Sequence, residues 1–125
     1  MTKTFELGRF SKDYLISWNV LTQAGFLSNT KLVAGDKTYF SYDKESTFHH
    51  LQMLGNGSAK IETDDPLQLI ITVHSDYEIK SAVVAGSILD QRAREVGYVY
   101  NFCIEDFIDD DYNDIYVDIV GWKSL

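Results

Sequence analysis

Hydrophobic and polar residues alternate along most of this chain with a period of two positions. The alternation is clearest over residues 14–20, 67–73, 96–104 and 115–119, where every second residue is aliphatic or aromatic. A period of two is typical of a β-strand with one buried face. Shorter segments with the same tendency occupy 5–7, 31–34, 37–41, 48–54, 59–62 and 79–84. The pattern therefore predicts a mostly β protein.

Turn signals separate several of these segments. Gly35-Asp36 suits a two-residue hairpin of type II′ or I′, because glycine tolerates a positive φ. Gly55-Asn56-Gly57 predicts a second turn, which closes a strand over 48–54 and allows 59–62 to pair with it. The charged segment 86–95 is compatible with a loop or a short helix, since its periodicity favours neither.

Length and composition indicate one domain. The chain has 125 residues, 45% of them hydrophobic, so we expect a single domain over residues 1–125. No apolar segment is long enough to span a bilayer, and residues 1–5 lack the apolar region of a secretory signal. We therefore expect synthesis in the cytoplasm, no membrane insertion, and export, if any, by a route without a signal peptide. The single Cys103 excludes an internal disulfide and suits a reducing compartment.

Acidic residues dominate the charge and are concentrated in one segment. The net charge of −8 disfavours nucleic acid and anionic membranes as partners, because both require a basic surface. Six carboxylates and one carboxamide lie between Glu105 and Asp114, with no Lys or Arg among them. Such a cluster repels itself unless a cation binds. Its ligand atoms are all oxygens, so a hard ion is expected, and clustered carboxylates favour calcium, one ion or two, over magnesium.

An acidic run is more often a solvated face or a disordered tail. Here apolar and aromatic residues interrupt the run and alternating segments flank it, so we interpret it as a loop between two strands. The spacing Asp109-x-Asp111-x-Asn113 matches the first half of an EF-hand loop. The match then fails, since Asp114 replaces the required glycine and Val120 replaces the bidentate glutamate. A calcium loop on a β scaffold is the interpretation that remains.

The same residues carry a family resemblance. Glu105-Asp106, followed by Asp109-x-Asp111-Tyr112-Asn113-Asp114 and by an alternating segment that ends at Trp122, resembles the C-terminal signature of the calcium-dependent fucose- and mannose-binding bacterial lectins of the LecB type. The match is dense over Glu105–Leu125, and upstream it is limited to strand rhythm and length. The resemblance implies an antiparallel β-sandwich of about nine strands. It also implies two adjacent calcium ions that coordinate sugar hydroxyls directly.

The resemblance assigns roles within the acidic segment. The metal ligands of the family fall on five residues here, Glu105, Asp109, Asp111, Asn113 and Asp114. Asp111 and Asp114 are expected to bridge the two ions. Asp106 and Asp109 fall where family members accept hydrogen bonds from the sugar, whereas Asp110 falls at a position that is not a ligand.

Outside this segment the assignments are fewer. The family has one more calcium ligand, an Asn at the end of an early strand, and Asn19 is the natural candidate. An ordinary strand Asn is an equally good interpretation. Val20 and Leu21 then fall in the loop that sets sugar preference, where they cannot hydrogen-bond a hydroxyl, and Thr22 is the nearest polar replacement. The preference for fucose or mannose is therefore left open.

The C-terminus falls at the distance from Trp122 that the family shows, which implies that the free carboxylate of Leu125 completes the calcium site of a partner subunit. Family members end in glycine, so the side chain of Leu125 is a departure. We interpret Trp122 itself as a core residue. The expected assembly is a homodimer or homotetramer, since multivalent display compensates for weak single sites.

The sequence is compatible with three classes of function. The favoured one is a non-enzymatic lectin that binds saccharides or glycoconjugates through calcium. The alternative is a structural or adhesive β-sandwich module that calcium stabilises without sugar binding. A hydrolase is least favoured, because carboxylates that bind calcium remain ionised and are poor general acids.

Overall fold

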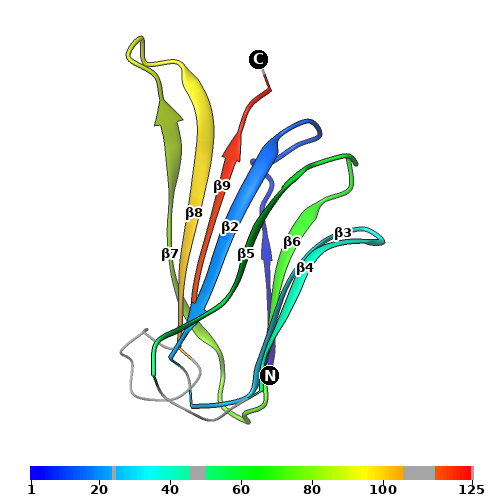
Figure 1. Cartoon of the computed structure of the whole chain (residues 1–125), viewed down its shortest axis with the longest axis vertical. Helices are drawn as coiled ribbons and strands as arrows, with labels where there is room; N and C mark the ends of the chain where they lie inside the picture. Colours follow the sequence, from blue (N-terminus) through cyan, green and yellow to red (C-terminus); the bar gives the residue numbers. More distant parts are fainter. Residues whose placement is uncertain (24, 46–49, 106–114, 125) are drawn as a thin grey trace.

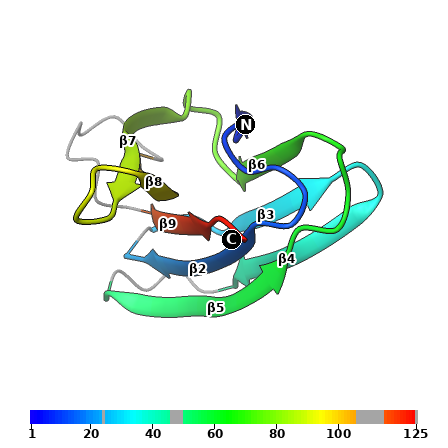
Figure 2. The same cartoon turned by 90° about the horizontal axis from the view of Figure 1, so that it is seen from above.

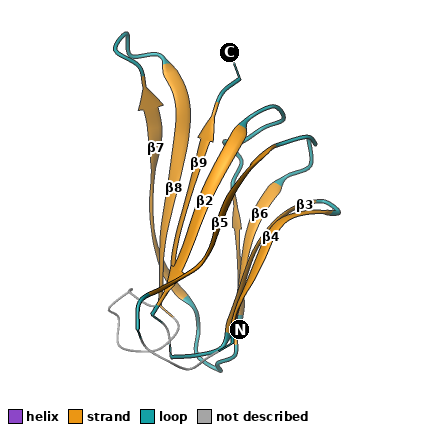
Figure 3. Cartoon of the chain, in the orientation of Figure 1, coloured by secondary structure: helices purple, strands orange, loops and turns teal. Residues whose placement is uncertain are grey.

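The structure is a computed structural model that describes residues 1–23, 25–45, 50–105 and 115–124. These residues form nine strands joined by loops and turns, with no helix among them and so none that could cross a bilayer (Figure 3). The strands are β1 (Thr2–Glu6), β2 (Leu15–Thr22), β3 (Ser28–Ala34), β4 (Lys37–Lys44), β5 (Gln52–Lys60), β6 (Leu67–Val73), β7 (Lys80–Leu89), β8 (Glu95–Glu105) and β9 (Ile115–Trp122).

The strands form two antiparallel sheets that pack face to face. Sheet A has the order β1-β6-β3-β4, and sheet B has the order β5-β2-β9-β8-β7 (Figures 1 and 2). The predicted all-β sandwich of about nine strands is therefore confirmed. The alternating apolar residues point between the sheets, as the pattern predicts. The fully buried ones include Ile16, Val20, Leu32, Leu69, Ile71, Phe102, Ile104, Ile115, Val117 and Ile119.

The best local turn signal is also confirmed. Ala34 pairs with Lys37, so Gly35 and Asp36 form a two-residue hairpin loop between β3 and β4. Of these two central residues only Gly35 has a positive φ, +57°, which fits type II′ rather than type I′. A side chain at Gly35 would also collide with Asp65.

The predicted turn at Gly55-Asn56-Gly57 is wrong, because β5 continues through these residues from Gln52 to Lys60, with one irregularity in its pairing with β2 beside Gly55. The two glycines lie where aromatic rings cover the strand. A Cβ atom on Gly55 would overlap the ring of Tyr42, and one on Gly57 would lie 2.8 Å from the ring of Trp18. Glycine is required here for close approach, not for a turn.

The segment 86–95 is neither a plain loop nor a helix. β7 continues to Leu89, and the chain turns over residues 90–94 before β8 begins at Glu95. Asp90 Oδ1 accepts hydrogen bonds from the backbone N–H groups of Arg92 and Arg94, at 2.8 and 3.0 Å. An aspartate that caps its own turn in this way explains why a charged segment can connect two strands.

Candidate functional site

The acidic segment is attached to one end of the sandwich. β8 ends at Glu105, β9 begins at Ile115, and Ile104 pairs with Ile115 across the two strands. The residues between them, 106–114, lie outside the described part of the structure, and with them Asp106, Asp109, Asp111, Asn113 and Asp114. We call the end of the sandwich where β2, β4 and β8 finish the acidic end (Figure 1). The opposite end is called the distal end.

Buried polar residues gather at the acidic end. Of the described residues, five polar or charged ones are buried: Thr22, Ser28, Thr30, Lys44 and Glu105. Four of them terminate or begin a strand at this end, and the fifth, Thr30, is two residues inside β3. The interior of the distal end is filled by Leu7, Phe10, Ile16, Ile61 and Leu67 instead. Buried polar groups are usually satisfied by partners, and Thr22, Lys44 and Glu105 do take part in such interactions. The interior of the acidic end is therefore more polar than that of the distal end.

The fold brings these side chains together from both sheets. The rings of Trp18 in β2 and Phe40 in β4 face each other across the interior, 5.1 Å apart. Four residues further along each strand, in the same direction, lie Thr22 and Lys44. Ser28 begins β3 beside Lys44, with which it pairs. Inward-facing polar groups of β2, β3 and β4 therefore converge at the acidic end.

Some polar atoms in this region have no hydrogen-bond partner. Four such buried atoms occur among the described residues, and three of them lie here: Ser28 Oγ, Thr30 Oγ1 and Gln52 Nε2. The fourth, Tyr39 Oη, lies nearer the distal end of β4. Gln52 pairs with Thr22 at the start of β5. Buried polar atoms without partners are rare in folded proteins. Their concentration at one end fits a site that receives polar ligands.

Glu105 is the one predicted metal ligand that the structure describes within the acidic run. None of its surface is exposed, and it lies opposite Lys80 at the start of β7. A buried carboxylate is stable only when a cation or several donors compensate its charge. The position and burial of Glu105 therefore fit its expected role as a metal ligand.

Lys44 is a charged residue of this end that sequence reasoning missed. Its side chain is only 2% exposed, although lysine is almost never fully buried. The sequence pattern does indicate that Lys44 is buried, because Lys44 continues the inward alternation of Phe40 and Tyr42 along β4. A buried ammonium group near an acidic segment adds positive charge where the protein is otherwise negative.

Asn19 does not lie where the sequence placed it. It is in the middle of β2, on the outer face of sheet B, and its Nδ2 donates a hydrogen bond to Asp118 Oδ1 at 3.0 Å. The strand continues for three residues, so Val20 and Leu21 belong to β2 and not to a loop. Thr22 is the residue at the strand end, and the structure brings Thr22, rather than Asn19, to the acidic end.

The connection from β2 to β3 is tied to β9. Gln23 follows directly after Thr22, and its Nε2 donates a hydrogen bond to Tyr116 Oη at 2.9 Å. Tyr116 is the second residue of β9, next to the point where residues 106–114 rejoin the sheet. This contact fixes the start of the 23–27 connection against the strand that leaves the acidic segment.

The C-terminus lies at the other end of the molecule. β9 runs away from the acidic end, so residues 123 and 124 are at the distal end, and Leu125 is outside the described residues (Figure 1). An eight-residue strand spans roughly 26 Å. Residues 123 and 124 therefore lie far from the acidic end of their own chain, and the donation expected of Leu125, which stays a prediction, would involve a second subunit.

The rest of the described chain offers no competing metal site. No group of three or more His, Cys, Asp or Glu side chains within residues 1–23, 25–45, 50–105 and 115–124 is arranged to hold an ion. His50 and His74 are exposed, and Cys103 is a half-buried free thiol. The calcium site expected at residues 105–114, whose side chains supply only hard oxygen ligands, stays a prediction, since only Glu105 of that segment is described.

Comparison with known proteins finds similar folds among solved structures but no similar sequence. No family model and no curated protein sequence matches the chain. Among solved structures, the C-terminal domain of the lectin BC2L-C from Burkholderia cenocepacia superposes with a TM-score of 0.69 at 19% identity, over 100% of both chains. The chain has the fold of a bacterial lectin.

Two further lectins share this fold. The Chromobacterium violaceum lectin CV2L, solved in complex with α-methyl-fucoside, has a TM-score of 0.64 at 16% identity. A high-affinity mannose-binding lectin from Ralstonia solanacearum has a TM-score of 0.65 at 13% identity. Both matches cover 98% of this chain and 96% of the other. The predicted lectin fold is thus confirmed over the whole sandwich, although sequence identity to these lectins is only 13 to 19%.

Proposed function

We propose that the protein is a calcium-dependent lectin that binds saccharides at the acidic end of its sandwich. The observation that carries this proposal is the concentration of buried polar groups at the end where residues 106–114 join the sheets. Polar residues inside one end of an otherwise apolar sandwich are costly for stability, and a functional site is the usual reason for such a cost. The lectin fold of the chain supports the same proposal.

The expected ligands of one or two calcium ions are Glu105, Asp109, Asp111, Asn113 and Asp114. Bound calcium provides open coordination positions that two neighbouring sugar hydroxyls can occupy in place of water. Asp106 and Asp109 accept the hydroxyl protons in charge-assisted hydrogen bonds. No covalent step is needed, so the proposal is a binding protein and not an enzyme. Two ions would change the net charge from −8 to −4.

The strands hold the ends of the site in place before any ligand arrives. Glu105 and Ile115 belong to neighbouring strands whose pairing is continuous up to the acidic end. Thr22 is fully buried at the same end, and its proposed hydrogen bond to a sugar hydroxyl would require the site to open at this point. Asn19 is bonded to Asp118 on the outer face and is not included among the ligands. Preorganised ends reduce the entropy lost on binding.

The terminal carboxylate of Leu125 is proposed to act on a partner subunit, because its own acidic end is the length of a strand away. Extending the chain by a short tag after Leu125 removes that carboxylate from the terminus. If the proposal is correct, the tag weakens saccharide binding but leaves the melting temperature of the calcium-free protein unchanged. Unchanged affinity would show that the terminus is not a ligand.

Calorimetric titration tests the function directly. Methyl-α-fucoside and methyl-α-mannoside are titrated into the protein in calcium and, separately, in EDTA, after a glycan array has ranked other sugars. The proposal expects binding in calcium and none in EDTA. The variant Glu105→Gln should lose binding, whereas the matched control Glu62→Gln, an exposed residue near the distal end, should bind as the wild type does.

A structural or adhesive module remains the second candidate, because buried acidic groups and calcium can also rigidify a β-sandwich without a ligand. The two functions differ in one result. If calcium raises the melting temperature but no sugar on the array binds, the structural module is correct and the lectin proposal fails.

A further inference from the structure

A pocket lies where the edges of the two sheets approach each other. β4 is the last strand of sheet A and β5 the first strand of sheet B, and the two strands lie close together along one side of the sandwich (Figure 2). The pocket has a volume of about 280 Å³, near the lower limit of small-molecule sites, which is roughly 300 Å³. We call it the edge pocket. Its lining includes Trp18 of β2, Lys37 and Tyr39 of β4, Gly57 and Lys60 of β5, and Glu62.

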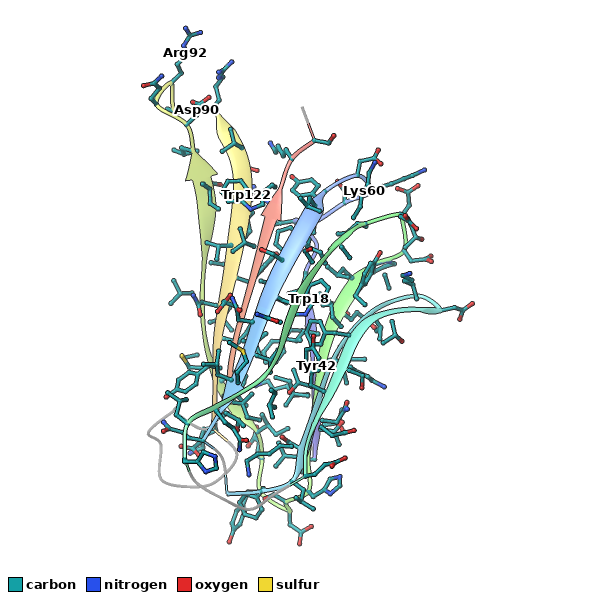
Figure 4. All side chains as sticks on the ribbon, in the orientation of Figure 1. Trp18, Tyr42, Lys60, Asp90, Arg92 and Trp122 are labelled. Carbon is teal, nitrogen blue, oxygen red and sulfur yellow. The ribbon has the colours of Figure 1, made fainter. Side chains whose placement is uncertain are left out.

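Aromatic rings form the floor of the edge pocket. Trp18 is only 5% exposed, and its indole N–H donates a hydrogen bond to Tyr42 Oη at 3.0 Å. Tyr42 Oη in turn donates to the backbone carbonyl of Asn56 at 3.3 Å, so both rings are held between the sheets (Figure 4). Gly57 lies against the indole, where a Cβ would come within 2.8 Å of the ring. The floor is therefore held in place before a ligand arrives, which reduces the entropy lost on binding.

Tyr39 reaches the edge pocket because of an irregularity in β4. Phe40 pairs with Leu32 of β3, but the next residue of β3 pairs with Thr38, so Tyr39 is the extra residue of a β-bulge. A bulge changes the direction of a side chain, and bulges are frequent beside functional sites. Regular alternation would place Tyr39 on the face opposite to that of Phe40. Its ring packs against the core instead.

The hydroxyl group of Tyr39 has no partner in the described part of the chain. Its Oη is buried and forms no hydrogen bond there. Buried polar atoms are nearly always hydrogen-bonded, so an exception requires an explanation. The neighbouring polar atoms of the floor, Trp18 Nε1 and Tyr42 Oη, are both paired. A polar ligand in the edge pocket would supply the partner that Tyr39 lacks.

The charges around the edge pocket select the class of ligand. Lys37 and Lys60 line it together with one carboxylate, that of Glu62, although acidic residues outnumber basic ones by 19 to 11 in the chain. Lys37 Nζ lies 5.7 Å from the centre of the Tyr39 ring and has no ion pair or hydrogen bond with another described residue. Lys60 pairs with Asp13 at 3.6 Å, but both side chains are more than half exposed, so this pair is weak. The lining therefore favours an anion.

We propose that the edge pocket binds an anionic monosaccharide unit without calcium. Lys37 Nζ and Tyr39 Oη donate hydrogen bonds to its carboxylate or sulfate group, and such charge-assisted bonds are the strong ones. The sugar ring lies over the aromatic floor. Its hydroxyls bond to the free edges of β4 and β5, because an edge strand presents N–H and C=O groups that no neighbouring strand uses.

The edge pocket is separate from the acidic end. Lys37 begins β4 and Lys44 ends it, and the seven residues between these positions correspond to roughly 23 Å. Binding at the edge pocket therefore does not depend on the calcium-dependent function proposed above.

NMR titration in EDTA tests the proposal. The chain has two tryptophans, so a proton–nitrogen spectrum shows two indole N–H signals, and Trp122→Phe identifies that of Trp18. Trp122 is 42% exposed at the end of β9, which corrects its predicted place in the core. Glucuronate or a glucose sulfate ester should shift the Trp18 signal saturably, and should bind about tenfold more tightly than glucose, acetate or inorganic sulfate. The tighter of the two sugar anions identifies the charged group.

Three variants locate the binding by effects of opposite sign. Lys37→Met should weaken sugar-anion binding about tenfold, whereas Glu62→Gln should strengthen it, because it removes a like charge. Tyr39→Phe should weaken binding without lowering the melting temperature, since it deletes a buried hydroxyl that has no partner among the described residues. Lys31→Met removes the same charge from the outer face of sheet A and is the matched control, which should leave the affinity unchanged.

Three results would overturn the proposal. The first is an unchanged Trp18 signal with both sugar anions at about 50 mM, well above a millimolar dissociation constant. The second is binding of glucose, acetate or inorganic sulfate as tight as that of the sugar anions. The third is an equal loss of affinity in Lys31→Met and Lys37→Met. All of these measurements are made in EDTA, so a failure of calcium-dependent binding at the acidic end would not change them.

Discussion

The two ends of the sandwich are made from the same strands but are closed in different ways. At the distal end Phe10 packs over Gly121 and against Tyr14 and Tyr100. The charged side chains described at that end lie on the surface. At the acidic end Lys44 and Glu105 are inside. Apolar packing stabilises a fold, whereas buried charge reduces stability unless it is compensated. This difference supports the proposal that the acidic end is the binding site, whereas the apolar packing of the distal end stabilises the fold.

The largest expected effect separates the two ends by function. Asp111→Ala and Asp114→Ala should each abolish saccharide binding in calcium, with affinity falling at least 100-fold, because each removes a proposed bridging ligand. Asp110→Ala, in the same segment but outside the ligand set, should change affinity little. Calorimetric titration in calcium measures all three. Equal effects of the three changes would show that the segment contributes only general negative charge.

The next largest effect concerns a change at the distal end, which should affect stability and not saccharide binding. Phe10→Ala should lower the free energy of unfolding by about 3 to 5 kcal/mol, because it leaves a cavity under the distal end. Saccharide affinity should not change, since the strands at the acidic end keep their pairing. Urea denaturation measures the first quantity and calorimetric titration the second. Loss of sugar affinity in a protein that is still folded would mean that the two ends are coupled.

Lys44 tests the electrostatics of the acidic end. Lys44→Met removes a buried positive charge while keeping much of the apolar volume. Calcium should bind several-fold more tightly, because a competing cation is gone. The protein without calcium should melt at a lower temperature, because buried negative charge is then less compensated. The control Lys37→Met, an exposed residue in the same strand, should alter neither quantity.

The smallest effect concerns a charge at the distal end. Hydrogen bonds from Ser87 and Arg9 lower the pKa of Glu95 from 4.5 to about 2. Because the pKa is depressed in the folded state, the stabilisation from Glu95 is present above pH 4.5 and is lost as the pH falls toward 2. The melting temperature of Glu95→Gln should therefore be lower than that of the wild type at pH 6. The gap should close near pH 2, and a constant gap would exclude this linkage.

Local patterns were sufficient to predict much of the fold. The alternation over 67–73 corresponds to β6, and the Gly35-Asp36 signal corresponds to the β3–β4 hairpin. The glycines at positions 55 and 57 do not form the turn that the sequence predicts, for a physical reason. Their role is to admit the rings of Tyr42 and Trp18 from neighbouring strands, and such contacts cannot be read from the local sequence.

The site was only partly predictable. The two strongly alternating segments that flank the acidic run correspond to β8 and β9, so the sequence predicted that the run connects two strands at one end of the sandwich. Its role as the binding site stays a prediction. Alternation does not show which of the two faces of a strand is covered, so Trp122 was predicted to be core, whereas it is 42% exposed on the outer face of sheet B. A family alignment with gaps placed Asn19 at a strand end, whereas β2 continues to Thr22. The proximity of Ser28 and Lys44 could not be predicted from the sequence, because it results from the pairing of β3 with β4.

The central claim is that the acidic end holds calcium through the carboxylates of residues 105–114. Calorimetric titration of calcium into EDTA-treated, dialysed protein tests this most directly, with the melting temperature recorded before and after. We predict saturable binding of one or two ions per chain and a marked rise in melting temperature, both absent in Asp111→Ala. No heat of binding, together with a melting curve that neither EDTA nor calcium changes, would contradict the account.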